Sequence, residues 1–171
     1  MTVIEQPERL EHADDVATLR VHRAGPLDVR RLCPLMVDGA WLGQIVDVED
    51  QPPGTTRYLT DLVLPLPPDG RLLSLRKAAF VDIGPVVTRG DGGCDVEIAW
   101  RSASLAPLFP VFAGHLTARP SGLTIEGHYA PPGGIVGRTA DRMLLHTAAR
   151  GTARWFLSHL ATVLRDQPPQ G

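Results

Sequence analysis

The sequence is poor in aromatic residues and in cysteine, and its charges nearly cancel. Aromatic residues make up 5% of the 171 residues, so few bulky side chains are present to fill an interior. The two cysteines, Cys33 and Cys94, lack the close spacing of a thiol redox or zinc motif and fit a reducing compartment. The net charge of −2 provides no overall attraction to nucleic acid, so we expect no nucleic-acid partner.

Long apolar runs and catalytic signatures are also missing. No stretch is long enough to span a bilayer, and residues 1–15 have no apolar core of a signal peptide, so we expect a cytoplasmic protein without a membrane span. No Gly-x-Ser-x-Gly elbow occurs, and neither cysteine has a neighbour in the sequence that would activate it. We therefore expect no catalytic set, no metal site and no cofactor.

Turn residues divide the remaining chain into strand-like segments. Alternation of apolar and polar residues predicts strands over 16–23, 56–66, 72–83, 94–101, 111–119 and 123–129. A short helix is expected over 26–36, interrupted by Pro34, and the segment 40–48 fits either a helix or a strand. Gly84-Pro85 is expected to kink or end its strand.

Two hairpins allow a register to be predicted. The turn Pro67-Pro68-Asp69-Gly70 joins the second and third strands, and our register sets Asp61 opposite Arg76, a favourable pair, and Lys77 opposite Thr60.

In the last hairpin, a two-residue loop at Ser121-Gly122 sets a register in which one face of the two strands is apolar and the other is polar. On the polar face, His115 and His128 are expected to face each other. Two histidines beside Glu126 suit zinc, but solvated surface histidines are the expectation.

A single long helical pattern closes the chain, from about residue 135 to residue 165. Its expected apolar face comprises Leu144, Leu145, Ala148, Ala149, Thr152, Trp155, Phe156, Leu160 and Val163. The first turns do not follow this face, so the helix bends near Met143, its first part is a separate short helix packed elsewhere, or it begins after a Thr139 cap. Four arginines, at 138, 142, 150 and 154, make the helix basic, which suits a solvated face, an acidic partner or anionic lipid head groups.

Several segments resemble the START-like helix-grip superfamily, also called SRPBCC or polyketide cyclase/dehydrase-like. They are Val81-Asp-Ile-Gly-Pro85, Leu108-Phe-Pro-Val-Phe-Ala-Gly114, Gly127-His-Tyr-Ala-Pro-Pro-Gly133 and Asp141-Arg-Met-Leu-Leu-His146. The resemblance, to an uncharacterised bacterial branch, implies an α+β fold in which a curved antiparallel sheet of six or seven strands wraps around the C-terminal helix. One or two short helices would follow the first strand. We expect one domain over 15–166, with a flexible arm over 1–14 and a disordered tail over 167–171.

The expected function is to bind a hydrophobic small molecule or lipid between the sheet and the last helix. The expected lining is Tyr58, Lys77, Trp100, Phe112, Leu116, Tyr129, Ala149, Thr152 and Phe156. The small side chains of the helix mean either close contact with the sheet or room for a ligand. Lys77, Tyr58 or His159 would orient the polar end of the ligand, although Lys77 also suits an ammonium at the sheet edge and His159 a core histidine.

Two other functions remain open at this point. The first is a cyclase, dehydratase or hydrolase that uses the same cavity and needs an acid and a base inside it. The second is an interaction module or a homodimer, because the strand 72–83 carries apolar residues on both faces, including Phe80.

Overall fold

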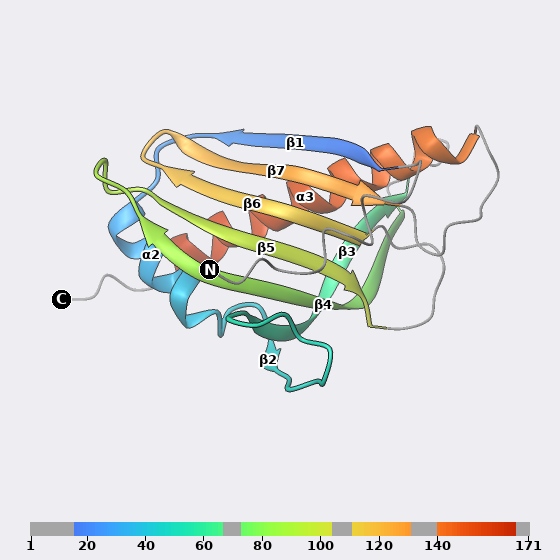
Figure 1. Ribbon diagram of the computed structural model, residues 1–171. Helices are drawn as coiled ribbons and strands as arrows, with labels where there is room; N and C mark the ends of the chain where they lie inside the picture. The colour runs from blue at the N-terminus through green and yellow to red at the C-terminus, as the bar shows by residue number, and fades with distance from the viewer. Residues whose placement is uncertain (1–15, 67–72, 104–110, 131–139, 167–171) are drawn as a thin grey trace.

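The computed structural model describes residues 16–66, 73–103, 111–130 and 140–166 (Figure 1). The strands are β1 (Ala17–Ala24), β2 (Gln44–Ile45), β3 (Thr56–Leu66), β4 (Leu73–Thr88), β5 (Cys94–Ser102), β6 (Val111–Arg119) and β7 (Gly122–Ala130). The helices are α2 (Val29–Asp38) and α3 (Ala140–Asp166). The expected arm over 1–14, the tail over 167–171 and the Pro67–Gly70 turn lie outside the described residues. None of the described helices is long and apolar enough to cross a membrane.

The strands form one curved antiparallel sheet in the order β1-β7-β6-β5-β4-β3-β2. The long helix α3 lies against one face of this sheet, behind it in Figure 1, and α2 lies near one end. Because β1 neighbours β7, the first and last strands meet, and α3 contacts β1 and β7 on one side and β3 on the other. This arrangement confirms the predicted α+β helix-grip fold with seven strands.

The inner face of the sheet is apolar because its strands alternate. Val96, Ile98 and Trp100 of β5 are buried, while Glu97 between them is exposed. Rows of inward side chains cross the sheet through cross-strand pairs, such as Ile98 with Gly114 and Gly114 with Gly127. Periodicity alone therefore predicted the buried face of β5 correctly.

A glycine pair in one of these rows makes room for an aromatic ring. A Cβ atom built on Gly114 would lie 2.8 Å from Cζ of Phe112, and one built on Gly127 would lie 2.9 Å from the same atom. The Phe112 ring therefore covers the two glycines on the inner face. A methyl group at either position would also meet backbone atoms of the neighbouring strand, within 2.6 Å or less.

Both predicted hairpin registers are wrong by two residues. Asp61 pairs with Ala78 and Lys77 with Leu62, so the expected Asp61–Arg76 pair does not form. A shift of two residues keeps every side chain on its predicted face, because the side-chain period of a strand is two.

The second hairpin has the same error. The turn uses Pro120 and Ser121, so that Arg119 pairs with Gly122. His115 pairs with Glu126 and His128 with Ala113, and the expected contact between the two histidines is absent. Both histidines are exposed, as expected for surface residues.

The helices differ from the prediction in their details. Pro34 lies inside α2 and does not divide it, because α2 continues to Asp38, where Gly39 closes it in the left-handed conformation at φ 57°. Helix α3 begins at Ala140, as the alternative with a late start expects. Its buried face includes Ala153, Leu157 and Leu164, which the predicted face left out.

Strand β4 continues through Gly84-Pro85 to Thr88, well beyond the predicted end at residue 83. Its pairing with β5 shifts between Ile83 and Val86, which marks a bulge. The expected kink is therefore present, but it bends the strand and does not end it.

The two cysteines, which we expected to lie in a reducing compartment, are bonded to each other. Cys33 of α2 and Cys94, the first residue of β5, form a disulfide with Cα atoms 6.1 Å apart. Both residues are buried. Disulfides are typical of oxidising compartments, so the pair removes the reason for expecting a reducing one. The cytoplasmic location thus stays a prediction without support from the cysteines.

Candidate functional site

One row of the inner face gathers most of the aromatic side chains predicted to line the site. Cross-strand pairs place Tyr58, Val81, Trp100, Phe112 and Tyr129 side by side across β3, β4, β5, β6 and β7. All five are buried. The sequence predicted four members of this row as site residues, and the pairing brings them together although they are far apart in the chain.

The centre of the row is an aromatic stack. The ring centroids of Trp100 and Phe112 are 4.2 Å apart and nearly parallel, and Phe156 of α3 lies 5.9 Å from Trp100. Phe156 also meets Trp41, from the segment after α2, edge to face at 5.6 Å. The stack therefore joins the sheet to α3, and Phe156 is the helix residue at its centre.

The side chains that precede Phe156 on the same face of α3 are small. Ala149, Thr152 and Ala153 are buried, at 2%, 0% and 0% exposure. The Thr152 hydroxyl donates a hydrogen bond to the Val63 carbonyl of β3 at 3.2 Å. Thr152 thus fixes the helix to the β3 side of the sheet and leaves no bulky group at this turn.

Tyr129 carries a polar contact that the sequence did not predict. Its hydroxyl lies 2.8 Å from Nδ1 of His146, which projects from the first turns of α3. Tyr129 is 5% exposed, whereas His146 is exposed. Burial raises the pKa of the Tyr129 hydroxyl above its ordinary value. The pair therefore connects a buried phenol to a histidine that faces solvent. His146 is not a member of the predicted apolar face of the helix, so only the three-dimensional contact reveals the pair.

Leu116 lies away from the rest of the predicted lining, and Tyr58 ends the aromatic row on β3 with its hydroxyl directed to the end of α2. The Tyr58 hydroxyl donates to the Asp38 carbonyl at 3.4 Å and packs against Gly39 at the end of α2. Burial, followed by the charge of Asp38, raises the pKa of Tyr58. Leu116 pairs with Val96, four residues before Trp100 along β5, or about 13 Å towards the disulfide. These two residues complete the core beside α2.

Lys77 and His159 are both half-buried but lie in different parts of the molecule. Lys77 is half-buried and shares a face of β4 with the buried Ala79 and Val81. His159 is half-buried and stacks on Trp155, with ring centroids 5.0 Å apart. Lys77 thus shares the inner face of the aromatic row, while His159 lies beyond Phe156 towards the end of α3.

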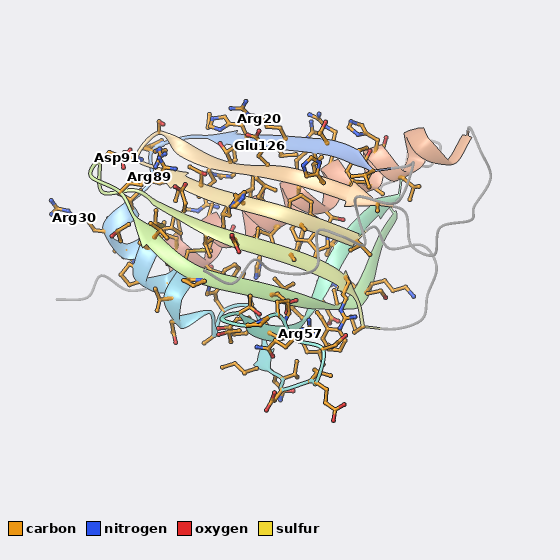
Figure 2. The ribbon with its side chains drawn as sticks, viewed as in Figure 1. Arg20, Arg30, Arg57, Arg89, Asp91 and Glu126 are labelled. Carbon is orange, nitrogen blue, oxygen red and sulfur yellow. A yellow bond between two sulfur atoms is a disulfide. The ribbon has the colours of Figure 1, made fainter. Side chains whose placement is uncertain are left out.

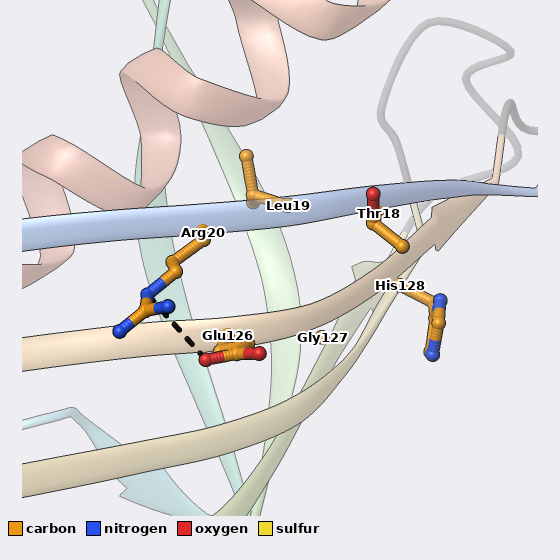
Figure 3. Close-up of a pocket in the computed structure, with 6 residues that line it drawn as sticks. All are labelled: Thr18, Leu19, Arg20, Glu126, Gly127 and His128. Atoms are coloured by element: carbon orange, nitrogen blue, oxygen red, sulfur yellow. Dashed lines mark ion pairs between the residues drawn. The ribbon is translucent and has the colours of Figure 1, made fainter.

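Two hollows open on the surface of the described residues. One, of about 350 Å³, lies over β1 and β7 and is lined by Thr18, Leu19, Arg20, Glu126, Gly127 and His128 (Figure 3). An ion pair between Arg20 and Glu126 at 3.5 Å crosses it (Figures 2 and 3). Because both side chains are well exposed, this hollow is a solvated part of the outer face. The other, of about 280 Å³, lies between α2 and the bulge of β4 and includes Tyr58.

The outer face of β3, β4 and β5 holds a charged network that the sequence did not reveal. Arg57 is fully buried and donates to both carboxylate oxygens of Asp82, at 2.6 and 2.8 Å (Figure 2). Arg57 also donates to Asp50 at 2.7 Å, and Asp50 accepts a second bond from Arg101 at 2.6 Å. The bonds from Arg101 and Arg57 hold the pKa of Asp50 below its ordinary value.

Phe80 belongs to the same network. The guanidinium carbons of Arg57 and Arg101 each lie 5.4 Å from the centroid of its ring. The two cation–π contacts explain why an apolar ring occupies the outer face of β4. A homodimer through this face, which Phe80 suggested, stays a prediction.

The architecture as a whole defines an α+β helix-grip fold. No protein-family model and no curated protein matches the chain. A solved structure similar to the chain is that of DynU16, a protein in the dynemicin biosynthetic locus, with a TM-score of 0.38 and 19% sequence identity. The match covers 91% of this chain and 49% of DynU16, so the chain spans about half the length of that protein. This likeness is too distant to transfer any property of DynU16.

Proposed function

We propose that the protein binds a hydrophobic small molecule between the aromatic row of the sheet and the small-residue turn of α3, as expected for a START-like helix-grip domain. The observation that carries the proposal is the pairing of these two surfaces. Trp100, Phe112 and Tyr129 lie on the face of the sheet that α3 covers, and the buried side chains in the turns before Phe156 are small: Ala148, Ala149, Thr152 and Ala153. Apolar walls with a few polar groups are the usual composition of ligand sites.

Binding would be driven by burial of apolar surface, at about 25 cal/mol per Å² before ordering costs. The polar groups at this place are the Tyr129 hydroxyl, the Trp100 indole N–H and the half-buried Lys77. Such a site favours a mainly apolar molecule with one polar end.

The experiment is a titration with N-phenyl-1-naphthylamine, an uncharged fluorophore that brightens in apolar surroundings. Ala149→Trp fills the space that the proposal assigns to the ligand, so we expect its affinity to fall at least about tenfold, or 1.4 kcal/mol. Arg154→Trp adds the same ring to an exposed position on the same helix and should bind as the wild type does. If the wild type does not bind the fluorophore and Ala149→Trp unfolds, the interior is solid and the proposal is wrong.

A second function is favoured by the contact between Tyr129 and His146. A catalyst of the cyclase or dehydratase kind needs an acid and a base within hydrogen-bond reach of each other and of the substrate. For exchange at carbon, Tyr129 would pass its proton to His146 and accept a proton from the acidic carbon of the substrate. The reverse transfer, with a deuteron that His146 takes up from solvent, would return hydrogen to that carbon.

Deuterium incorporation at the acidic carbon of a cyclic diketone tests this activity by NMR. Tyr129→Phe should abolish any acceleration and retain binding of the fluorophore. Acceleration that survives in Tyr129→Phe would rule out the pair as its source.

A further inference from the structure

Trp100 holds a buried hydrogen-bond donor that has no partner. Its side chain is 2% exposed, and its Nε1 atom is among the buried nitrogen atoms of the described residues without an acceptor. An indole has a single donor and no acceptor, so no other atom of this side chain compensates. Leaving such a group unpaired costs roughly 1–3 kcal/mol. Buried groups of this kind are rare in folded proteins and need an explanation.

Other polar side chains of the interior have hydrogen-bond partners, in contrast to Trp100. The indole of Trp41 donates to the Leu35 carbonyl at 3.1 Å, and the hydroxyl of Thr152 donates to Val63. Two arginines of the described residues also have one buried unpaired nitrogen, but each guanidinium forms an ion pair through another nitrogen. Among these residues, Trp100 alone leaves its entire hydrogen-bonding capacity unused.

The side chains that pair or stack with Trp100 provide no acceptor for its N–H group. A buried water needs two to four polar partners. The neighbours of Trp100 across the sheet are Val81 and Phe112, and its neighbour from the helix is Phe156. None of these side chains offers a polar atom, so the partners of a water here would have to come from other groups, of which the Tyr129 hydroxyl already contacts His146.

We propose that the Trp100 N–H group is a specificity-determining contact, which donates a hydrogen bond to a carbonyl oxygen of the bound ligand. This inference rests on the proposed binding function and narrows its ligand class. Phe112 and Phe156 stack against the indole, so a ligand reaches it at the ring edge, where Nε1 lies. Because the indole N–H group can only donate, it selects a ligand with an acceptor atom at this place over one that presents only C–H groups or an ammonium. The site therefore favours apolar molecules that carry a ketone or a similar carbonyl over hydrocarbons of the same shape.

The test uses two tricyclic probes of nearly the same shape, 9-fluorenone and fluorene, which differ by one carbonyl oxygen. Affinities are measured by displacement of N-phenyl-1-naphthylamine. The wild type should prefer 9-fluorenone. Trp100→Phe keeps an aromatic ring and removes the donor, so it should lose about tenfold affinity for 9-fluorenone and change less than about twofold for fluorene. Trp155→Phe, a half-buried tryptophan of α3 that stacks on His159, should change neither affinity.

The outcomes separate this inference from the function on which it rests. If neither probe binds the wild type, the binding function itself fails. If both bind and Trp100→Phe weakens both equally, the indole serves only as packing and the inference is wrong. Should Trp100→Phe fail to fold, the indole N–H signals of the wild type decide by NMR. The Trp100 signal should move downfield with 9-fluorenone and stay in place with fluorene, and an equal response to both probes overturns the proposal.

Discussion

Reduction of the disulfide between Cys33 and Cys94 should destabilise the protein strongly. The bond closes a loop with a sequence separation of 61 residues. In the chain-entropy treatment, a loop of this length restricts the unfolded chain by about 14 cal/mol/K, or about 4 kcal/mol at 25 °C. Typical domains have a total stability of about 5–15 kcal/mol. The bond thus contributes a large part of the free energy of unfolding.

The assay is urea unfolding followed by circular dichroism, with and without a phosphine reductant, after equilibration. With a slope of about 2 kcal/mol/M, the midpoint should fall by about 2 M on reduction. The double variant Cys33→Ala/Cys94→Ala is the control, because it has no bond to reduce and should give the same midpoint in both conditions. Each protein is compared with itself in the presence and absence of reductant, so the packing cost of losing two buried sulfur atoms does not enter the difference.

Two results would refute this reasoning. Titration of the unfolded, unreduced protein with a thiol reagent could find two free thiols, in which case the bond does not form. Alternatively, the reductant could leave the midpoint of the wild type unchanged. The chain-entropy gain would then be offset by strain of the bonded native state or by structure retained in the unfolded chain.

Two further predictions concern the sheet. Asp82→Ala should lower the free energy of unfolding by about 3 kcal/mol, because it removes two of the hydrogen bonds of the fully buried Arg57. Asp61→Ala, at an exposed position of β3, should change it by less than about 0.5 kcal/mol, and equal losses would show that the buried ion pair is not special. Gly127→Ala should cost about 1–3 kcal/mol, because its Cβ would lie 2.3 Å from a backbone oxygen. Gly90→Ala, with open space around it, should be nearly neutral in the same thermal melts.

Much of the fold followed from local patterns in the sequence. The alternation in β5 predicted its buried face, and the long helical pattern after residue 135 predicted a closing helix that must lie on the sheet. The register of the last hairpin failed because the two-residue loop can be Ser121-Gly122 or Pro120-Ser121, and a loop moved by one residue moves the pairing by two. Both positions bury the same side chains, so hydrophobic pattern cannot distinguish them.

The alternation of inward and outward residues also predicted part of the candidate site. Aromatic residues at inward positions of separate strands were expected to share a surface, and the pairing brings Trp100, Phe112 and Tyr129 into one row. Contacts between residues far apart in the chain leave no pattern in the neighbouring sequence that could predict them. The bond of Tyr129 with His146 spans 17 residues, and the disulfide spans 61. The buried Arg57 was missed because its partner Asp82 is 25 residues away on another strand.

The length of β5 separates the disulfide from the ligand contact that we propose for Trp100. Cys94 begins the strand at the disulfide, and Trp100 lies six residues later, about 20 Å along it. Substitutions that far apart, with no shared partner, have additive effects. Substitutions near Trp100 that lower the free energy of unfolding should therefore leave the contribution of the disulfide intact. Because the stabilising bond lies far from Trp100, the protein suits the engineering of new binding specificities at that end of β5.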